Sequence, residues 1–348
     1  MKDPMALPPL IEDESALEDQ LSRPDAALAE SLGRLTGDIV VLGAGGKMGL
    51  SLARMARRAF DIAGSDHRVF AVSRFSDLSR RAAFEAAGIE TVSADLLERA
   101  ALDRLPDGAL IVAMAGQKFG TAADTPRTWA SNVILPVQIM RRYEGRRVVA
   151  FSSGNIYGLV PITSAGSRVG DVPHPVGEYA MSVLGRERIY EYFAMEHGTP
   201  TALIRLNYAC ELRYGVLVDI AGWVWHERPV PLAMGYFNVI WQGDANRMTL
   251  RAWEHASSPA SIFNVTGPER IAVRDIATWF GRRWGKEIAW DGEEAGDALL
   301  ADTSGMSERL GGPHVPLQQM LEWIANWFES NNTVWNKPTH FENRVGDF

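Results

Sequence analysis

The chain has 348 residues, of which 46% are hydrophobic and 22% are charged, and its formal net charge is −8. This length suffices for one large domain or two modest domains with a substantial core. The acidic balance argues against nucleic acid as a partner, because a surplus of basic groups is needed to neutralise phosphates. No window approaches the ~18 uninterrupted apolar residues of a membrane span, and the first residues lack the apolar core of a signal peptide.

Cysteine and histidine usage bounds the chemistry further. The single cysteine, Cys210, rules out an internal disulfide and fits the reducing cytoplasm, which is the predicted location. We expect this thiol to be a packed small residue rather than a nucleophile. The seven histidines are scattered without the spacing of a metal site, so no metal is expected.

Residues 1–36 form an acidic extension ahead of the first strand. Two short stretches, 12–21 and 25–35, have helical composition, and Pro24 separates them. Because the extension carries no chemical motif, we expect it to be a lid, an edge cover or an oligomer contact.

A strand, a glycine turn and a helix follow one another between residues 38 and 56. In such a turn Gly43 lets the chain leave the strand, Gly46 lets backbone approach a pyrophosphate, and Gly49 lets the helix pack on the strand. The N–H groups at the start of the helix attract phosphates, so Lys47 and Met48 are also assigned to cofactor binding. Alone the motif is weak evidence, because glycine turns also join strands to helices that bind no ligand.

Strand-like and helical segments alternate from residue 38 to about residue 203. The expected strands are residues 38–42, 68–72, 90–92, 109–113, 147–151 and 201–204. This alternation predicts an α/β fold with a Rossmann-type doubly wound parallel sheet and with ligand at the carboxyl ends of its strands.

The remainder is less regular and predicts a smaller, mixed C-terminal substrate lobe. Its expected helices are residues 222–227, 244–255, 273–285 and 316–328. We divide the chain into an N-terminal helical extension, a dinucleotide-binding domain, a substrate lobe interleaved with that domain, and a tail (residues 1–36, 37–205, 206–330 and 331–348). The tail either wraps a neighbouring subunit or its own body, or is disordered.

Three strand ends carry further candidates for cofactor binding. After the second strand, Ser73 and Arg74 could donate to a 2′-phosphate, which favours NADP(H) over NAD(H), unless Arg74 is a solvated loop residue. After the third strand, Asp95 and Leu96 could meet the adenine. After the fourth strand come Ala115 and Gly116, whose small size lets backbone lie against a dinucleotide, and Lys118, which is either a phosphate or substrate ligand or a solvated side chain.

The most informative feature is a pair of hydroxyl groups. Ser153 ends the fifth strand, and Tyr179 lies in the first turn of a later helix. This arrangement can place both side chains on the same substrate oxygen. We therefore assign Ser153 and Tyr179 as the catalytic residues.

Taken together, these motifs resemble the extended short-chain dehydrogenase/reductases, the NAD-dependent epimerase/dehydratase family. The resemblance covers about residues 38–330. It rests on motifs in the family's order: the glycine turn, Asp95 with Leu96, Asn132, Ser153 with Tyr157, and Tyr179. It implies that Tyr179 is the catalytic tyrosine, that Asn132 belongs to the cofactor site and that the chain forms a homodimer.

One departure concerns proton transfer. The family has a lysine four residues after its tyrosine, and here that position holds Val183. A phenol with a pKa of about 10 is ionised roughly one part in a thousand at pH 7, a deficit of ~4 kcal/mol for a base but none for an acid. Reduction is therefore favoured over oxidation. Arg186 or Lys118 could replace the lysine; alternatively, Arg186 pairs with an acid such as Glu187 or Glu191.

A second departure concerns the substrate. Asn155, Asn207 and Tyr208 are assigned to substrate binding, but Asn207 arrives one residue earlier than in the family's pattern. The lobe also lacks the Arg-Asp-containing segment with which many nucleotide-sugar enzymes hold the diphosphate. Four aromatic residues of the lobe either stack on a sugar ring or belong to its core: Trp223, Trp225, Tyr236 and Trp241.

The sequence thus predicts an NAD(P)-dependent oxidoreductase of the epimerase/dehydratase type. Its expected substrate is a sugar, sugar acid or nucleotide sugar that reacts at a carbonyl or hydroxyl group, with reduction favoured. Two alternatives stay open: an epimerase or dehydratase that retains its cofactor, and a regulatory protein that binds a dinucleotide without turnover.

Overall fold

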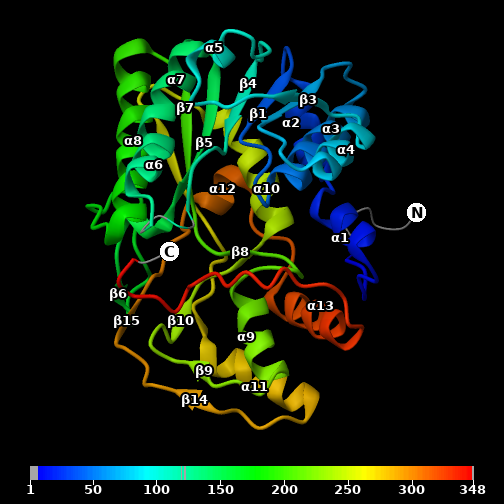
Figure 1. Cartoon of the computed structure of the whole chain (residues 1–348), viewed down its shortest axis with the longest axis vertical. Coiled ribbons are helices and arrows are strands. Elements are labelled where there is room, and N and C mark those ends of the chain that lie inside the picture. Colours follow the sequence, from blue (N-terminus) through cyan, green and yellow to red (C-terminus); the bar gives the residue numbers. More distant parts are fainter. Residues whose placement is uncertain (1–6, 119, 121–122, 347–348) are drawn as a thin grey trace.

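The structure is a computed structural model that describes residues 7–118, 120 and 123–346. Its centre is a seven-stranded sheet in which every neighbouring pair of strands is parallel (Figure 1). In spatial order the strands are β12 (Ser261–Val265), β7 (Thr201–Leu206), β5 (Arg147–Ser153), β4 (Leu110–Ala113), β1 (Ile39–Leu42), β2 (Val69–Ser73) and β3 (Glu90–Ser93). The predicted Rossmann-type α/β fold is therefore confirmed.

The central strands are apolar on both sides because helices cover both faces of the sheet. All four residues of β1 and all four of β4 are buried, as expected for a parallel sheet enclosed between helical layers. In β5 the side chains alternate: Val149 and Phe151 belong to one core, and Val148 and Ala150 belong to the other.

Two helical layers flank the sheet. One contains α2 (Ala26–Gly33), α3 (Gly49–Ala63), α4 (Leu78–Ala86), α10 (Gln242–Arg251) and α12 (Met306–Leu310). The other contains α5 (Arg99–Leu102), α7 (Leu135–Arg142) and α8 (Gly177–His197). The short helix α6 (Thr125–Trp129) and the π-helical turn η1 (Ala130–Ile134) lead into α7 and pack against α8.

A second core lies below the sheet in Figure 1. Its helices are α9 (Val216–Trp225), α11 (Val273–Trp284) and α13 (Leu317–Glu329). Its short strands pair as β6 (Val160–Pro161) with β15 (Asp297–Ala298), β8 (Ala209–Cys210) with β11 (Ile240–Trp241), β9 (Val230–Pro231) with β14 (Trp290–Asp291), and β10 (Tyr236–Phe237) with β13 (Ile271–Ala272). Short 3-10 turns are η2 (Gly154–Ile156) and η3 (Ala252–His255).

Two features of this second half differ from the expected pattern. Helix α9 begins at Val216, six residues before the expected start, because Gly215 adopts φ +139° and the apolar residues that follow it are buried. Strand β12, from the segment assigned to the substrate lobe, forms an edge of the central sheet. The division of the chain into four segments stays a prediction.

The N-terminal extension joins the two cores. Helix α1 (Glu14–Leu21) buries Leu17 and Leu21 in the second core, whereas α2 buries Leu28 in the first. Both helices begin with an aspartate that accepts a backbone N–H bond, at Asp13 and Asp25. The extension packs on α3 and α10 rather than along a strand edge.

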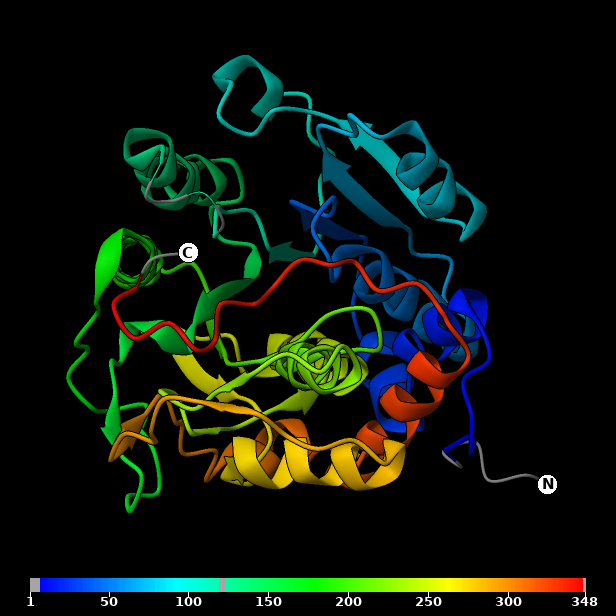
Figure 2. The same cartoon turned by 60° about the horizontal axis from the view of Figure 1, so that its bottom comes forward.

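The tail wraps the chain's own body, which is one of the three predicted outcomes. Its described part, residues 331–346, runs from α13 across the region between the two cores toward the start of α8 (Figure 2). The backbone N–H of Trp335 donates to the backbone carbonyl of Arg213, and Arg344 forms an ion pair with Asp297. Among the residues that the structure describes, no helix is both long enough and apolar enough to cross a bilayer.

Candidate functional site

The glycine turn after β1 is shaped by two of its three predicted glycines. Gly43 adopts φ +80°, and a Cβ there would lie 2.5 Å from the Cα of Ala115. A Cβ on Gly49 would lie 1.9 Å from the carbonyl oxygen of Ala44, so this glycine lets α3 pack against the turn. A Cβ on Gly46 meets nothing closer than 3.6 Å. The open space at Gly46 fits a position that a ligand approaches.

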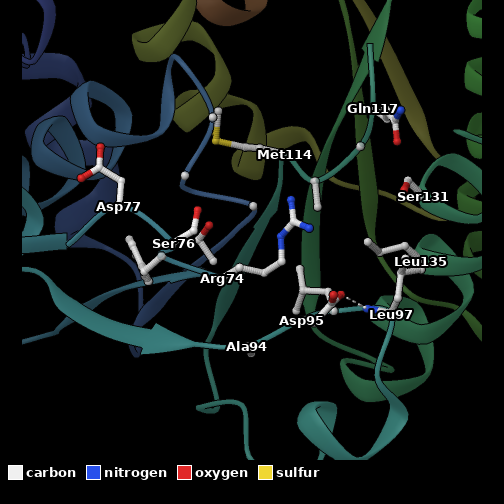
Figure 3. A pocket seen from close by; sticks show the side chains of 18 of the residues that line it. Arg74, Ser76, Asp77, Ala94, Asp95, Leu97, Met114, Gln117, Ser131 and Leu135 are labelled. Atoms are coloured by element: carbon white, nitrogen blue, oxygen red, sulfur yellow. Dashed lines mark hydrogen bonds between the residues drawn. The ribbon is translucent and has the colours of Figure 1, made fainter. Parts of the chain in front are cut away.

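A first pocket of about 660 Å³ lies at the carboxyl ends of β1, β2, β3 and β4 (Figure 3). Of the predicted cofactor residues, those that line it are Gly43, Gly46, Ser73, Arg74, Asp95, Leu96, Ala115 and Gly116. The carboxylate of Asp95 accepts the backbone N–H of Leu97 at 3.0 Å, which fixes the loop after β3. Motifs that lie far apart in the sequence therefore meet at one sheet edge.

The first pocket is lined by charges of both signs. Arg74 is exposed, and Asp77 and Asp95 carry carboxylates to the same lining (Figure 3). Arg80 and Arg127 add two further guanidinium groups. The hydroxyl of Ser79 and the backbone N–H of Arg80 hold the pKa of Asp77 below its usual value. Asp77 is therefore ionised at neutral pH.

A second pocket of about 370 Å³ adjoins the first, and Gly43, Gly46, Met114 and Gly116 line both. Predicted residues that line only the second are Lys47, Met48, Lys118, Ser153, Asn155, Tyr179, Asn207 and Tyr208. It thus contains both assigned catalytic residues and all three assigned substrate residues. Gly49 and Asn132 line neither pocket: Gly49 packs against Ala44, and Asn132 is fully buried.

Ser153 and Tyr179 are brought together as expected. Ser153 ends β5, Tyr179 lies in the first turn of α8, and a side-chain hydrogen bond joins them. Burial raises the pKa of Tyr179, and the positive charge of Arg186 and the bond to Ser153 oppose this only in part. The phenol is therefore neutral at pH 7 and carries a proton that it can donate.

Arg186 lies behind this pair, one turn of α8 beyond Val183. Val183 is fully buried beside Tyr179. The guanidinium of Arg186, also buried, donates to the carbonyl of Phe151 at 3.2 Å and to the side-chain oxygen of Asn132. Arg186 thus places a positive charge on the same helix as Tyr179, and this charge lowers the pKa of the phenol.

The alternative role of Arg186, pairing with a neighbouring acid, is not what the structure shows. Glu187 pairs with Arg205 at 2.8 Å, and Glu191 pairs with Arg188. The Glu187–Arg205 pair is buried, and the hydroxyl of Ser152 donates to Glu187. These ionic bonds hold the end of β5 against α8 and leave Arg186 directed to Asn132.

Asn132 links the helix layer to the loop after β4. Its side chain accepts the backbone N–H of Gln117 at 2.9 Å and donates to the carbonyl of Gln117 at 3.0 Å and to the hydroxyl of Ser182 at 2.8 Å. A Cβ on Gly116 would lie 1.9 Å from the Arg186 guanidinium. Asn132 therefore shapes the pocket from behind rather than lining it.

Other parts of the second pocket were missed by sequence reasoning. Tyr214 comes from a loop of the second core, and Thr339 comes from the tail. Neither residue lies in a motif, so no local signal identifies them. The four aromatic residues that could have stacked on a sugar, by contrast, belong to or pack against the second core: Trp223, Trp225, Tyr236 and Trp241.

Cys210 has no part in either pocket lining. It is buried, and burial raises its pKa well above the ordinary value, so it is a packed side chain as expected. Among the residues that the structure describes, no three histidine, cysteine or acidic side chains gather in a way that could hold a metal ion.

Comparison with known proteins finds one family whose model matches part of the chain, and solved structures with a similar fold. The model of the NAD dependent epimerase/dehydratase family matches residues 39–209. MoeE5, solved with UDP-glucose and NAD, is similar at 18% identity and a TM-score of 0.69, covering 85% of this chain and 99% of its own. No curated protein matches by sequence.

Two further solved structures have the same fold. The UDP-glucuronic acid 4-epimerase from Bacillus cereus, in complex with NAD, is 17% identical with a TM-score of 0.69. The UDP-glucose 4-epimerase from Thermotoga maritima, with UDP-glucose, is 18% identical, also with a TM-score of 0.69. In both cases the match covers 84% of this chain and 99% of the other.

The expected preference for NADP(H) over NAD(H) is wrong. The matching family is NAD dependent, and the MoeE5 and Bacillus cereus structures hold NAD. The physical reason lies in the first pocket. Arg74 is a solvated side chain, the alternative left open above, so water screens its charge from a 2′-phosphate.

The motif order read from the sequence, the sheet topology and the family match agree with one another. The glycine turn, Ser153 and Tyr179 all lie within the matched residues. The chain is an NAD-dependent enzyme of the epimerase/dehydratase type. Its residues 39–209 match the model of the NAD dependent epimerase/dehydratase family.

Proposed function

We propose that the chain is an oxidoreductase that exchanges a hydride between NAD and the carbonyl or hydroxyl carbon of a sugar-like small molecule, with reduction as the favoured direction. The observation that carries this proposal is the hydrogen bond between the side chains of Ser153 and Tyr179, in a pocket that adjoins the glycine turn. A hydroxyl pair at this place can bind one reacting oxygen and supply it with a proton.

The residues around the first pocket fit a dinucleotide. Gly46 leaves open space, and the backbone N–H groups at the start of α3 suit a pyrophosphate. Asp95 and Leu96 would meet the adenine, while Ala115 and Gly116 would let the dinucleotide lie along β4. When bound, NAD supplies the hydride chemistry that the side chains themselves lack.

The proton step depends on Tyr179. Its raised pKa keeps the phenol protonated at neutral pH, so it acts as a general acid toward a carbonyl oxygen that Ser153 also holds. Oxidation of an alcohol would need the phenolate, which burial disfavours. This asymmetry supports the reductive direction.

A cycle in which NAD is reduced and then reoxidised without leaving is the second candidate. It is supported by the similar folds that are UDP-sugar epimerases. The two candidates differ in cofactor stoichiometry. An epimerase or dehydratase would be purified with NAD and show no net change in NADH, whereas a reductase would consume NADH in equal amount with its product.

Exchange of the catalytic phenol tests both candidates. We expect Tyr179→Phe to lower turnover by about 10²- to 10⁴-fold, the contribution of a positioned acid, and to leave NAD affinity nearly unchanged. Tyr236→Phe, which removes a hydroxyl from a residue outside both pocket linings, is the matched control. Equal activity of Tyr179→Phe and the unaltered enzyme would contradict the proposal, as would failure of calorimetric titration to detect NAD binding.

We also propose that the chain forms a homodimer through η1 and α8. The support is a set of exposed large apolar side chains on α6, η1 and α8: Trp129, Ile134, Met181, Tyr192 and Met195. Helix α8 lies at the outer edge of the molecule in Figure 1, so this face is accessible to a second copy. Light scattering during size-exclusion chromatography measures the state directly, and a monomer would contradict the proposal.

A further inference from the structure

The second pocket has little room beyond what a cofactor needs. It contains Ser153 and Tyr179, and Gly46 of the glycine turn lines both pockets. A dinucleotide whose adenine end lies in the first pocket would therefore bring its reactive half into the second. Ligand sites measure roughly 300–1,000 Å³, and the second pocket, at about 370 Å³, lies at the low end of this range. The substrate has to share this volume with part of the cofactor.

One wall of the second pocket comes from a segment of the tail that we call the strap, residues 335–346. Thr339 of the strap lines the pocket and is buried. Its backbone N–H and its hydroxyl donate to the carboxylate of Asp219 at 2.8 and 2.6 Å. Asp219 lies in the first turn of α9, so these two bonds fix the middle of the strap to the second core.

The strap is also held at both ends. At its start, the backbone N–H of Trp335 donates to the carbonyl of Arg213 at 3.0 Å, and the Arg213 guanidinium lies 4.7 Å from the centre of the Trp335 ring. Near its end, Arg344 donates to the carbonyls of Ala233 and Asp297, both at 3.0 Å. Figures 1 and 2 show this segment crossing between the two cores. Contacts of this kind tie down a terminus that would otherwise be poorly ordered.

An aromatic side chain anchors the strap beside the pocket. Phe341 is buried in the second core, and its ring centre lies 6.3, 5.7 and 5.8 Å from those of Tyr208, Trp223 and Phe237. Tyr208 itself lines the second pocket. Removing the Phe341 ring would therefore loosen the strap at the place where it bounds the pocket.

The strap fills the space next to the second pocket on the far side of Tyr208. A small cavity of about 40 Å³ lies there, and Asn155 and Tyr208 line both this cavity and the second pocket. Arg344 and Gly346 of the strap line the small cavity as well. The strap packs closely at this end, since a Cβ on Gly177 would lie 2.5 Å from the carbonyl oxygen of Gly346. A substrate that extended past Asn155 and Tyr208 would collide with the strap.

We propose, resting on the proposed function, that the strap determines specificity by size and that the substrate is a free sugar or sugar acid without a nucleotide. A single sugar ring at Ser153 and Tyr179 needs only the space inside the second pocket. A nucleotide attached to that ring needs space that Thr339 and the rest of the strap occupy. The strap thus selects the substrate by excluding larger molecules.

The test measures binding to the NAD-loaded full-length protein by calorimetry and turnover by NADH absorbance. The probes are free hexoses and hexuronates, each compared with its UDP conjugate. Phe341→Ala removes the ring that anchors the strap. Thr339→Val is a milder variant that removes the hydroxyl bonded to Asp219.

A matched control separates release of the strap from general loosening of the second core. Phe280→Ala removes a buried ring of the same core, whose centre lies 4.9 Å from that of Trp284 and 5.2 Å from that of Trp279. Thermal unfolding establishes that each variant is folded. If Phe341→Ala does not fold, Thr339→Val carries the test.

We expect the unaltered protein to bind at least one free sugar or sugar acid roughly tenfold more tightly than its UDP conjugate. Phe341→Ala should reduce this preference roughly tenfold, because the conjugate can then displace the loosened strap. Thr339→Val should shift the preference in the same direction by a smaller factor. Phe280→Ala should keep it within about twofold.

Four results would overturn the inference. The unaltered protein might bind none of the free compounds, or it might bind a UDP conjugate as tightly as the free compound. Phe341→Ala and Thr339→Val might both keep the full preference, or Phe280→Ala might relax it as much as Phe341→Ala does. Failure of the proposed function is a separate result: free sugars would bind with a preference that depends on the strap, but no hydride transfer would depend on Tyr179.

Discussion

The two pockets are built in different ways. Most residues that line the first directly follow four neighbouring strands, so short local motifs place most of its wall. Arg80, Arg127, Ser131 and Leu135 are added from helices. The second takes its lining from the glycine turn, β5, α8, the loops of the second core and the tail. Its geometry depends on how distant segments pack.

This difference separates a cofactor pocket that is common to the fold from a substrate pocket that is particular to this chain. A parallel sheet brings its carboxyl ends to one edge in any doubly wound fold, so a dinucleotide pocket follows from topology. The second pocket carries this chain's departures: Val183 beside Tyr179, Arg186 behind it, and Thr339 at its wall. Substrate choice and proton transfer must be decided there.

Alanine at two glycines of the turn should break the first pocket in two distinct ways. Gly49→Ala places a Cβ 1.9 Å from the carbonyl oxygen of Ala44, so we expect the free energy of unfolding to fall by ~3 kcal/mol. Gly46→Ala meets open space, so stability should change by less than ~1 kcal/mol while NAD affinity falls by roughly tenfold or more. Denaturant unfolding and NAD titration measure the two effects.

The pair of glycine variants contains its own control. If Gly46→Ala destabilises the fold as much as Gly49→Ala does, the open space at Gly46 does not exist. If Gly46→Ala binds NAD normally, the pyrophosphate does not approach this turn.

Removing the charge behind the phenol should alter the second pocket more subtly. Arg186→Met leaves Asn132 without its cationic donor and takes away a charge that lowers the pKa of Tyr179. We expect turnover to fall roughly tenfold, the effect of one lost positioning charge. Adding Val183→Lys to this variant should restore a cation near the phenol and recover part of the loss.

The pH profile distinguishes this role from a purely structural one. A raised pKa keeps Tyr179 protonated, so reduction should be flat from neutral pH upward and should fall only as the phenol ionises. Oxidation should rise with pH, and Arg186→Met should move that rise to higher pH because the phenolate loses its cation. Arg188→Met, an exposed change on the same helix, should leave the profile where it was.

Local signals made most of the fold predictable. Buried β-branched runs such as residues 39–42 identified the sheet, and the glycine turn indicated where its ligand edge lies. The partners of Arg186 were not predictable, because Asn132 and the carbonyl of Phe151 meet it only after packing. Thr339 gave no signal for the same reason.

The prediction of NADP(H) was wrong because it rested on only two neighbouring residues. Ser73 and Arg74 suggested a phosphate site because they follow β2 directly. The solvent exposure of Arg74 is set by how the loops after β2 and β3 meet. A motif identifies which loops form a pocket, but the balance of charge within it depends on all of them.

The smallest expected effect belongs to that same arginine. Because Arg74 is exposed and its charge is screened by solvent, Arg74→Met should change NAD affinity by no more than about twofold. Arg80→Met is the comparison, since Arg80 donates to the carbonyl of Gly46 at 2.6 Å and supports the glycine turn. Titration calorimetry with NAD at two salt concentrations measures both variants. A tenfold loss in Arg74→Met that disappears at high salt would show that Arg74 binds the cofactor after all.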